Sequence, residues 1–120
     1  MPQRENALDA VISTDVLHHI KNPCNRLLFI QHIIDTLKVG GKALITIPSF
    51  EQTPKKSLRS IGNQDFLVPT DNEKGEIVYL YYHLYSHDEV IAMFAVFQDK
   101  ICVLSIVAEN DKWCVKFIKV

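Results

Sequence analysis

Residues 8–48 constrain the fold of this 120-residue chain more than any other segment. They begin with LDAVISTDVLHHI, pass through an amphipathic stretch and end with LKVGGKALITIP. The nearly continuous apolar run over Ala7–Thr14, rich in β-branched residues, predicts a strand in a sheet that is covered on both faces. A second apolar run over Lys42–Ile47 predicts another buried strand, which ends at Pro48. Two such strands around an amphipathic stretch indicate an α/β fold.

The stretch between these strands predicts a helix. Asn22 is expected to be its N-cap, with Pro23 at the first helical position. Gly40-Gly41 is expected to end the helix after Lys38. Apolar residues recur between these limits at helical spacing: Leu27, Ile30, Ile33, Ile34 and Leu37. Strand, helix and strand with short connections form a βαβ unit, so we expect parallel strands and a right-handed crossover.

The middle of the chain differs in character from this unit. Ser49–Gly75 is rich in proline, glycine and basic residues and contains few apolar ones. We interpret it as a long loop or insertion at about residues 49–76 of a single domain, because loops of this length in compact domains tend to be functional or mobile. It is followed by the aromatic cluster IVYLYYHLY over 77–85.

The last third of the chain predicts a helix and a hairpin. Ser86 and Glu89 have the spacing of a capping box, which places a helix start there. Lys100–Ala108 and Lys112–Val120 are predicted strands, and Trp113 is expected to pack in the core. Three residues separate the two strands, so they should form an antiparallel hairpin.

Composition and charge exclude several classes of protein. The chain has 13 basic and 14 acidic residues and a net charge of -1, so no overall field attracts it to nucleic acid or membrane. Cys24, Cys102 and Cys114 are odd in number and far apart, which argues against a disulfide framework and a zinc site and favours reduced, mostly buried thiols. No apolar run approaches the ~20 residues of a membrane helix, and the charged N-terminus does not look like a signal peptide. We expect a soluble protein without a metal site.

Two motifs connect this order of elements to a known superfamily. They are DAVIST at Asp9–Thr14 and LKVGGKALITIP at Leu37–Pro48. The order resembles the C-terminal half of the class I S-adenosylmethionine-dependent methyltransferases. The resemblance implies a partial Rossmann-like sheet containing the family's strands four to seven, with the last strand of the terminal antiparallel hairpin inserted beside an interior strand.

Four further segments narrow the resemblance to the eukaryotic tRNA wobble-uridine methyltransferases, which esterify 5-carboxymethyluridine. The segments are PQRENALDAVISTDVLHHI near the start, DFLVP at 65–69, YYHLYSHDEV at 81–90 and NDKWCV at 110–115. The resemblance implies S-adenosylmethionine as cofactor and tRNA as partner. It also implies a small zinc-binding activator subunit, and a location in the cytoplasm or in both cytoplasm and nucleus.

The chain departs from the family in two respects. Thr70 stands where these enzymes usually have tryptophan after the Val-Pro of the insertion. The family's first three strands are not in this chain. The glycine-rich loop that holds the methionine end of the cofactor and the acidic residue that holds its ribose belong to those strands and are absent with them. We therefore expect the 120 residues by themselves to be only marginally stable and to bind the cofactor weakly or not at all. The family's fourth strand would be exposed as an apolar sheet edge.

Polar residues at the carboxyl end of the first strand are the first candidates for a site, because ligands of open α/β sheets bind at that edge. By resemblance, Ser13 and Thr14 line the cofactor's sulfonium and Asp15 the substrate entrance, where we assign it a catalytic role. The alternative is that these side chains only terminate a strand and cap a turn.

The histidines and tyrosines are the next candidates. We favour His18 as the catalytic residue that faces the pocket, with His19 as a packing or exposed residue that could contact tRNA, since neighbours on a helix do not face the same way. By resemblance, Tyr82 and His83 are the best candidates on the substrate side, where an aromatic ring could stack on an extruded base. Some rings of the aromatic cluster should instead be core.

Lys55, Lys56 and Arg59 form the local basic cluster and could contact anticodon-loop phosphates. A solvated loop is the alternative for each. Two other functions also stay open: a non-catalytic remnant or tRNA-binding module, and a class I methyltransferase with another substrate.

Overall fold

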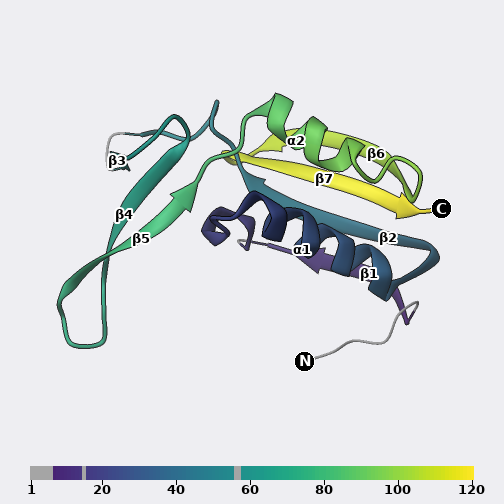
Figure 1. Ribbon diagram of the computed structural model, residues 1–120, viewed down its shortest axis with the longest axis horizontal. Coiled ribbons are helices and arrows are strands. Elements are labelled where there is room, and N and C mark those ends of the chain that lie inside the picture. The colour runs from purple at the N-terminus through teal and green to yellow at the C-terminus, as the bar shows by residue number, and fades with distance from the viewer. Residues whose placement is uncertain (1–6, 15, 56–57) are drawn as a thin grey trace.

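The computed structural model describes residues 7–14, 16–55 and 58–120 (Figure 1). In chain order the elements are β1 (Leu8–Ser13), the short 3₁₀ helix η1 (Leu17–His19), α1 (Pro23–Thr36), β2 (Leu37–Pro48), β3 (Arg59–Ser60), β4 (Asp65–Asp71), β5 (Ile77–His83), α2 (His87–Ala95), β6 (Ile101–Glu109) and β7 (Lys112–Lys119).

The main sheet has four strands in the order β1-β2-β7-β6. β1 and β2 are parallel, whereas β7 is antiparallel to both β2 and β6. The prediction of strands four to seven with a closing hairpin is confirmed. The hairpin turn contains Asn110 and Asp111 with φ of 50° and 62°. These two residue types tolerate the left-handed region that a short hairpin turn requires.

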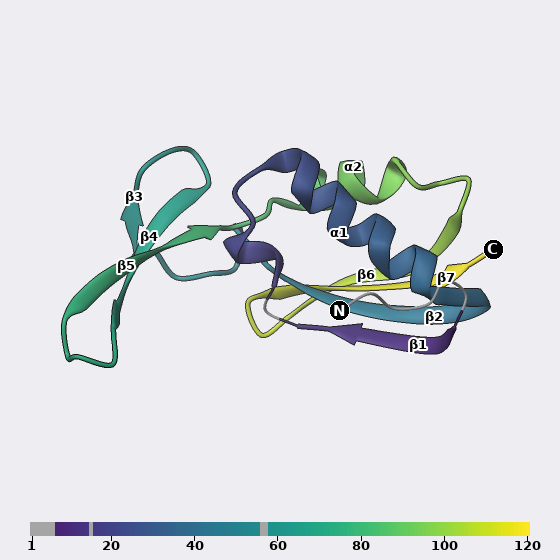
Figure 2. The same cartoon turned by 60° about the horizontal axis from the view of Figure 1, so that its bottom comes forward.

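Both helices cover the same face of the main sheet (Figure 2). Ala43, Ile45 and Ile47 of β2 alternate toward this face and are buried in the core. On β1, however, Ile12 is 73% exposed. The prediction that the first strand is covered on both faces is therefore wrong for the described chain, because α1 and α2 both pack on the same face of the main sheet. Neither helix, among the described residues, has the length and apolar content to cross a membrane.

Helix α1 begins as predicted and ends earlier. The Asn22 side chain accepts a hydrogen bond from the Cys24 amide at 2.8 Å, which confirms the N-cap. The helix ends at Thr36, not Lys38, because Leu37 is already extended and pairs with Leu8 of β1. Gly40, with φ of 86°, lies within β2 where the ladder to β1 shifts register, so the glycine pair bends a strand and does not stop the helix.

The segment expected to be a long loop contains two strands. β4 pairs with β3 and with β5 in a second, antiparallel sheet that extends away from the main sheet (Figure 1). The two sheets meet after β5, where the Tyr85 amide donates to the Pro48 carbonyl and the Phe50 amide to the Tyr85 carbonyl, both at 2.9 Å. The buried Trp113 indole also donates to the Tyr85 carbonyl at 3.0 Å, and its predicted core position is confirmed.

The three cysteines are free, as expected from their spacing. Their predicted burial is wrong, since Cys24 and Cys102 are exposed and Cys114 is half-buried. Cys24 sits in the first turn of α1 and Cys102 on the edge strand β6, both at the periphery of the core.

Candidate functional site

The carboxyl end of β1 lies beside that of β2, since the two strands are parallel. Ser13 is the last residue of β1, is half-buried and pairs with Ile45 of β2. Thr14 follows and is exposed. Asp15 lies outside the described residues. The predicted cofactor-side residues are thus at the edge where α/β sheets bind ligands, and their roles stay predictions.

Two neighbouring histidines, His18 and His19, meet Tyr82 at this edge, although Tyr82 is far from them in the sequence. The His18 ring lies on the Tyr82 ring with centroids 4.5 Å apart, and its neighbour His19 is 3.8 Å away by the same measure. His18 is buried, at 5% exposure, whereas His19 is exposed and Tyr82 half-buried. This arrangement favours His18 as the support of Tyr82, with His19 and Tyr82 as the rings that a ligand could reach. We call these two rings, which contact each other at a tilt of 32°, the His18–Tyr82 pair.

His83, which is predicted on the substrate side, is enclosed by side chains of the chain itself. It is buried, and both of its ring nitrogens already contact carboxylates. Nδ1 lies 2.7 Å from Asp65 Oδ1, and Nε2 lies 2.8 Å from Glu89 Oε2. Each ring nitrogen therefore lies within hydrogen-bonding distance of a different carboxylate. The visible role of His83 is therefore to join β4, β5 and α2.

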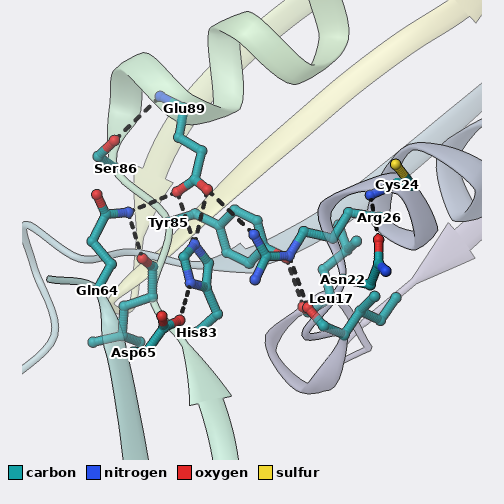
Figure 3. A network of polar contacts seen from close by, with 12 residues as sticks. Leu17, Asn22, Cys24, Arg26, Gln64, Asp65, His83, Tyr85, Ser86 and Glu89 are labelled. Carbon is teal, nitrogen blue, oxygen red and sulfur yellow. Dashed lines mark hydrogen bonds and ion pairs between the residues drawn. The ribbon is translucent and has the colours of Figure 1, made fainter. Parts of the chain in front are cut away.

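The contacts of His83 belong to a larger polar network at the junction of the two sheets (Figure 3). Gln64 donates to Glu89 Oε1 at 2.7 Å and to the Leu84 carbonyl at 2.9 Å. The Tyr81 hydroxyl donates to Asp65 Oδ1. The Arg26 guanidinium, from α1, lies 3.7 Å from Glu89 Oε2. Four elements, α1, β4, β5 and α2, therefore converge on one group of charges.

Glu89 has a double role in this network. Its backbone amide donates to the Ser86 hydroxyl at 3.2 Å, which confirms the first half of the predicted capping box. Its carboxylate points instead to His83 and Arg26, so the reciprocal half of the box is replaced by long-range contacts.

The network shifts the pKa values of its acids and tyrosines. Burial alone would raise the pKa of Asp65 and of Glu89, but hydrogen bonds and the charges of His83 and Arg26 outweigh it and lower both. Burial, followed by the hydrogen bond to Asp65, raises the pKa of Tyr81 to about 12. Burial also raises the pKa of Tyr85. At neutral pH the cluster therefore consists of two carboxylates and two neutral phenols.

These shifts predict an acid-sensitive stability. The folded-state pKa values of Asp65 and Glu89 lie below their usual values of 3.8 and 4.5. Their stabilisation is thus present above the usual values and is lost as the pH falls through the lowered ones. Denaturant unfolding from roughly pH 6 to pH 3 should show a decrease in free energy of unfolding that is shallower in Glu89→Gln. Asp9→Asn, which removes an exposed carboxylate 3.5 Å from Lys38, is the control. Equal acid slopes in Glu89→Gln and the unsubstituted chain would contradict the assignment.

The predicted basic cluster is not gathered at the histidines. The Lys55 ammonium donates to the carbonyls of Phe50 and Thr53 and lies 4.5 Å from the Phe50 ring centre, so its contacts are within its own loop. Arg59 is exposed at the start of β3. Lys56 lies outside the described residues. Phosphate binding by these residues stays a prediction.

Arg26, Asp65 and Glu89 were not among the predicted site residues. One signal for Arg26 is present in the sequence: it lies in the first turn of α1, where a cation is unfavourable for the helix dipole and where no acidic residue accompanies it. Asp65 lies within the family-like DFLVP segment, and Glu89 within the capping box. Nothing local indicated that their side chains would meet.

The described side chains can be compared with the groups that a metal ion or the cofactor would require. No group of three or more histidine, cysteine or acidic side chains within residues 7–14, 16–55 and 58–120 could hold a metal ion. For the cofactor, the carboxyl end of β1 is the edge at which α/β sheets bind ligands. The glycines of this chain lie elsewhere: Gly40 and Gly41 at the start of β2, and Gly62 and Gly75 in turns of the second sheet. These 120 residues therefore fit only part of an S-adenosylmethionine site.

Sequence comparison finds relatives over part of the chain. It is 42% identical over 57 residues to a tRNA (carboxymethyluridine(34)-5-O)-methyltransferase of Xenopus tropicalis, a match covering 48% of this chain and 9% of that protein. It is 34% identical over 70 residues to the protein of the same name from Schizosaccharomyces pombe, covering 58% of this chain and 31% of the relative. The chain thus matches less than a third of either protein. No protein-family model matches it.

Solved structures share the fold over the whole chain. An S-adenosylmethionine-dependent methyltransferase of Methanosarcina mazei superposes with a TM-score of 0.70 at 14% identity, covering 100% of this chain and 63% of that one. The 1,6-didemethyltoxoflavin-N1-methyltransferase of Burkholderia thailandensis, solved with bound S-adenosylhomocysteine, superposes with a TM-score of 0.63 at 12% identity, covering 99% and 47%. These likenesses show a class I, Rossmann-like methyltransferase fold.

Proposed function

We propose that this chain, which resembles the tRNA wobble-uridine methyltransferases in sequence and has the class I methyltransferase fold, is part of an enzyme that methyl-esterifies carboxymethyluridine in tRNA. The observation that carries the proposal is the match to relatives whose names specify this reaction, at 42% and 34% identity. The fold supports it independently, because both structural neighbours are methyltransferases.

The proposed reaction requires little covalent chemistry from the protein. S-adenosylmethionine, when bound, supplies a methyl group on a sulfonium. A carboxylate substrate is already ionised at neutral pH, so no general base is needed. The residues of the chain then act by holding the two reactants in line and by excluding water.

We assign the binding roles from position at the sheet edge. Ser13 and Thr14 at the end of β1 are proposed to face the cofactor. Asp15, which lies outside the described residues, is assigned to the substrate entrance from the resemblance alone. The exposed His19 and the half-buried Tyr82 offer rings on which an extruded uracil could stack, with His18 behind them. Lys55, Lys56 and Arg59 are proposed to contact tRNA phosphates. The activator subunit stays a prediction from resemblance.

The test is a methyl-transfer assay with the complete gene product, labelled S-adenosylmethionine and tRNA that carries 5-carboxymethyluridine. Tyr82→Ala is expected to weaken tRNA binding by roughly 1–3 kcal/mol, the usual contribution of one stacked base. His32→Ala is the matched control, because His32 is exposed on α1. The label should appear as a base-labile ester on the wobble uridine.

Two results would overturn the proposal. Methyl transfer to a protein or a small molecule but not to tRNA would identify a class I enzyme with another substrate. Salt-dependent tRNA binding without methyl transfer would instead support the non-catalytic binding module.

A further inference from the structure

Arg26 is a buried arginine whose contacts reach four other parts of the fold. Its side chain leaves the first turn of α1 and is only 6% exposed. Nε donates to the Ile20 carbonyl at 2.8 Å and Nη2 to the Tyr81 hydroxyl at 3.1 Å. Nη1 lies 3.7 Å from Glu89, and the guanidinium carbon lies 5.3 Å from the centre of the Tyr85 ring. A single cation thus connects the end of η1, β5, the segment after it and α2.

The contacts of Arg26 with Ile20, Tyr81 and Tyr85 bear on η1, the short helix that carries the histidines. Ile20 is the residue that caps η1 at its C-terminal end. Arg26 packs on the ring of Tyr85, and the Tyr85 hydroxyl donates to the Leu17 carbonyl inside η1 at 2.7 Å. His19 Nδ1 donates to the carbonyl of Tyr81 at 3.0 Å, and the hydroxyl of the same tyrosine accepts from Arg26. A three-residue helix has few hydrogen bonds of its own, so these long-range bonds determine where it lies.

On β5, the same polar network fixes the position of Tyr82, the ring that contacts His18. Tyr82 lies between Tyr81 and His83 on β5. Tyr81 is bonded to Arg26 and Asp65, and His83 to Asp65 and Glu89. Because both neighbours of Tyr82 are held on one side of the strand, its own ring is directed to the other side, where His18 lies.

We propose that Arg26 is a positioning residue, which together with Glu89 holds η1 against β5 so that the rings of the His18–Tyr82 pair stay in contact at the sheet edge. Arg26 acts through these residues and does not itself meet a ligand. Arginine suits this task and lysine does not, because the rigid guanidinium donates in several fixed directions while an ammonium is a single point. The expected loss of RNA affinity when Arg26 is replaced rests on the proposed function, whereas the expected loss of contact between the His18 and Tyr82 rings does not.

The test compares Arg26→Lys and Glu89→Gln with the control Lys38→Gln, which breaks an exposed ion pair with Asp9. The first readout is the nuclear Overhauser contact between the His18 and Tyr82 rings, measured in protein that retains native signals from the core residues Ile45 and Val115. We expect this contact to fall by about half or more in both network variants and to stay unchanged in the control, because positioning by a charge-assisted network is lost when one member changes.

The second readout is affinity for an anticodon stem-loop, where we expect a loss of about tenfold in both variants with an unchanged salt dependence. A ring contact that keeps its full intensity in folded Arg26→Lys, with only a lower free energy of unfolding, would overturn the proposal. If Arg26→Lys does not fold, Glu89→Gln decides in the same way, because the helix cap uses only the Glu89 backbone amide. Failure of the unsubstituted protein to bind the stem-loop would refute the proposed function, and the ring contact would still test the role of Arg26.

Discussion

Phe117→Ala is expected to destabilise the protein by about 3–5 kcal/mol, the usual cost of truncating a buried phenylalanine. Phe117 lies in β7, an interior strand of the main sheet, and is fully buried. It pairs with Ala43 of β2 and Val103 of β6, and its ring centre lies 5.9 Å from that of Phe94 in α2. The substitution therefore opens a cavity where the sheet meets a helix.

A loss of this size is a large part of the roughly 5–15 kcal/mol that stabilises a typical domain. Urea unfolding followed by circular dichroism should show a clear decrease in midpoint, or an unfolded chain before any urea is added. Leu104→Ala on β6 is the matched control, because Leu104 is 53% exposed and its truncation should change stability by about 0.5 kcal/mol or less. Similar midpoints for the two variants would contradict the described core.

Calorimetric titration of the 120-residue chain with S-adenosylmethionine is expected to show a Kd in the millimolar range or weaker, which corresponds to about 4 kcal/mol of binding free energy or less. Ser13 and Thr14 at the end of β1 offer one side of a cofactor site. The four glycines of this chain lie early in β2 and in turns of the second sheet, so none stands at the carboxyl end of β1, where a glycine turn could approach a ligand closely.

The same titration with the full-length methyltransferase of Schizosaccharomyces pombe provides the comparison, and S-adenosylhomocysteine serves as a second ligand. Micromolar binding to the 120-residue chain would contradict the prediction. It would mean that the residues at the carboxyl ends of β1 and β2 suffice to hold the cofactor.

Local signals predicted the elements of the main sheet well. Asn22 and Ser86 cap their helices as their spacing indicated, and Asn110-Asp111 turns the closing hairpin. These features depend on neighbours within a few residues, so a single sequence carries them. The end of α1 was misplaced because pairing between Leu37 and Leu8, a contact outside the local sequence, takes over from the helix.

The second sheet escaped prediction for a related reason. β4 contains Pro69, which argues against a strand, and the surrounding segment has little alternation. Its strand character comes from pairing with β5, where Pro69 faces Tyr79. The exposed face of β1 likewise depends on where both helices pack, which periodicity does not specify.

For this protein, the sequence alone determined the α/β order, the helix starts, the closing hairpin and the resemblance to a methyltransferase family. Only the tertiary structure decided that His18 lies on Tyr82, that His83 is enclosed by Asp65 and Glu89, and that Arg26 joins them. The physical reason is range. Caps and turns are made by groups a few residues apart, whereas Arg26 and Tyr81 are 55 residues apart and Leu17 and Tyr85 are 68 apart. Such bonds exist only after both sheets have packed around α1 and η1.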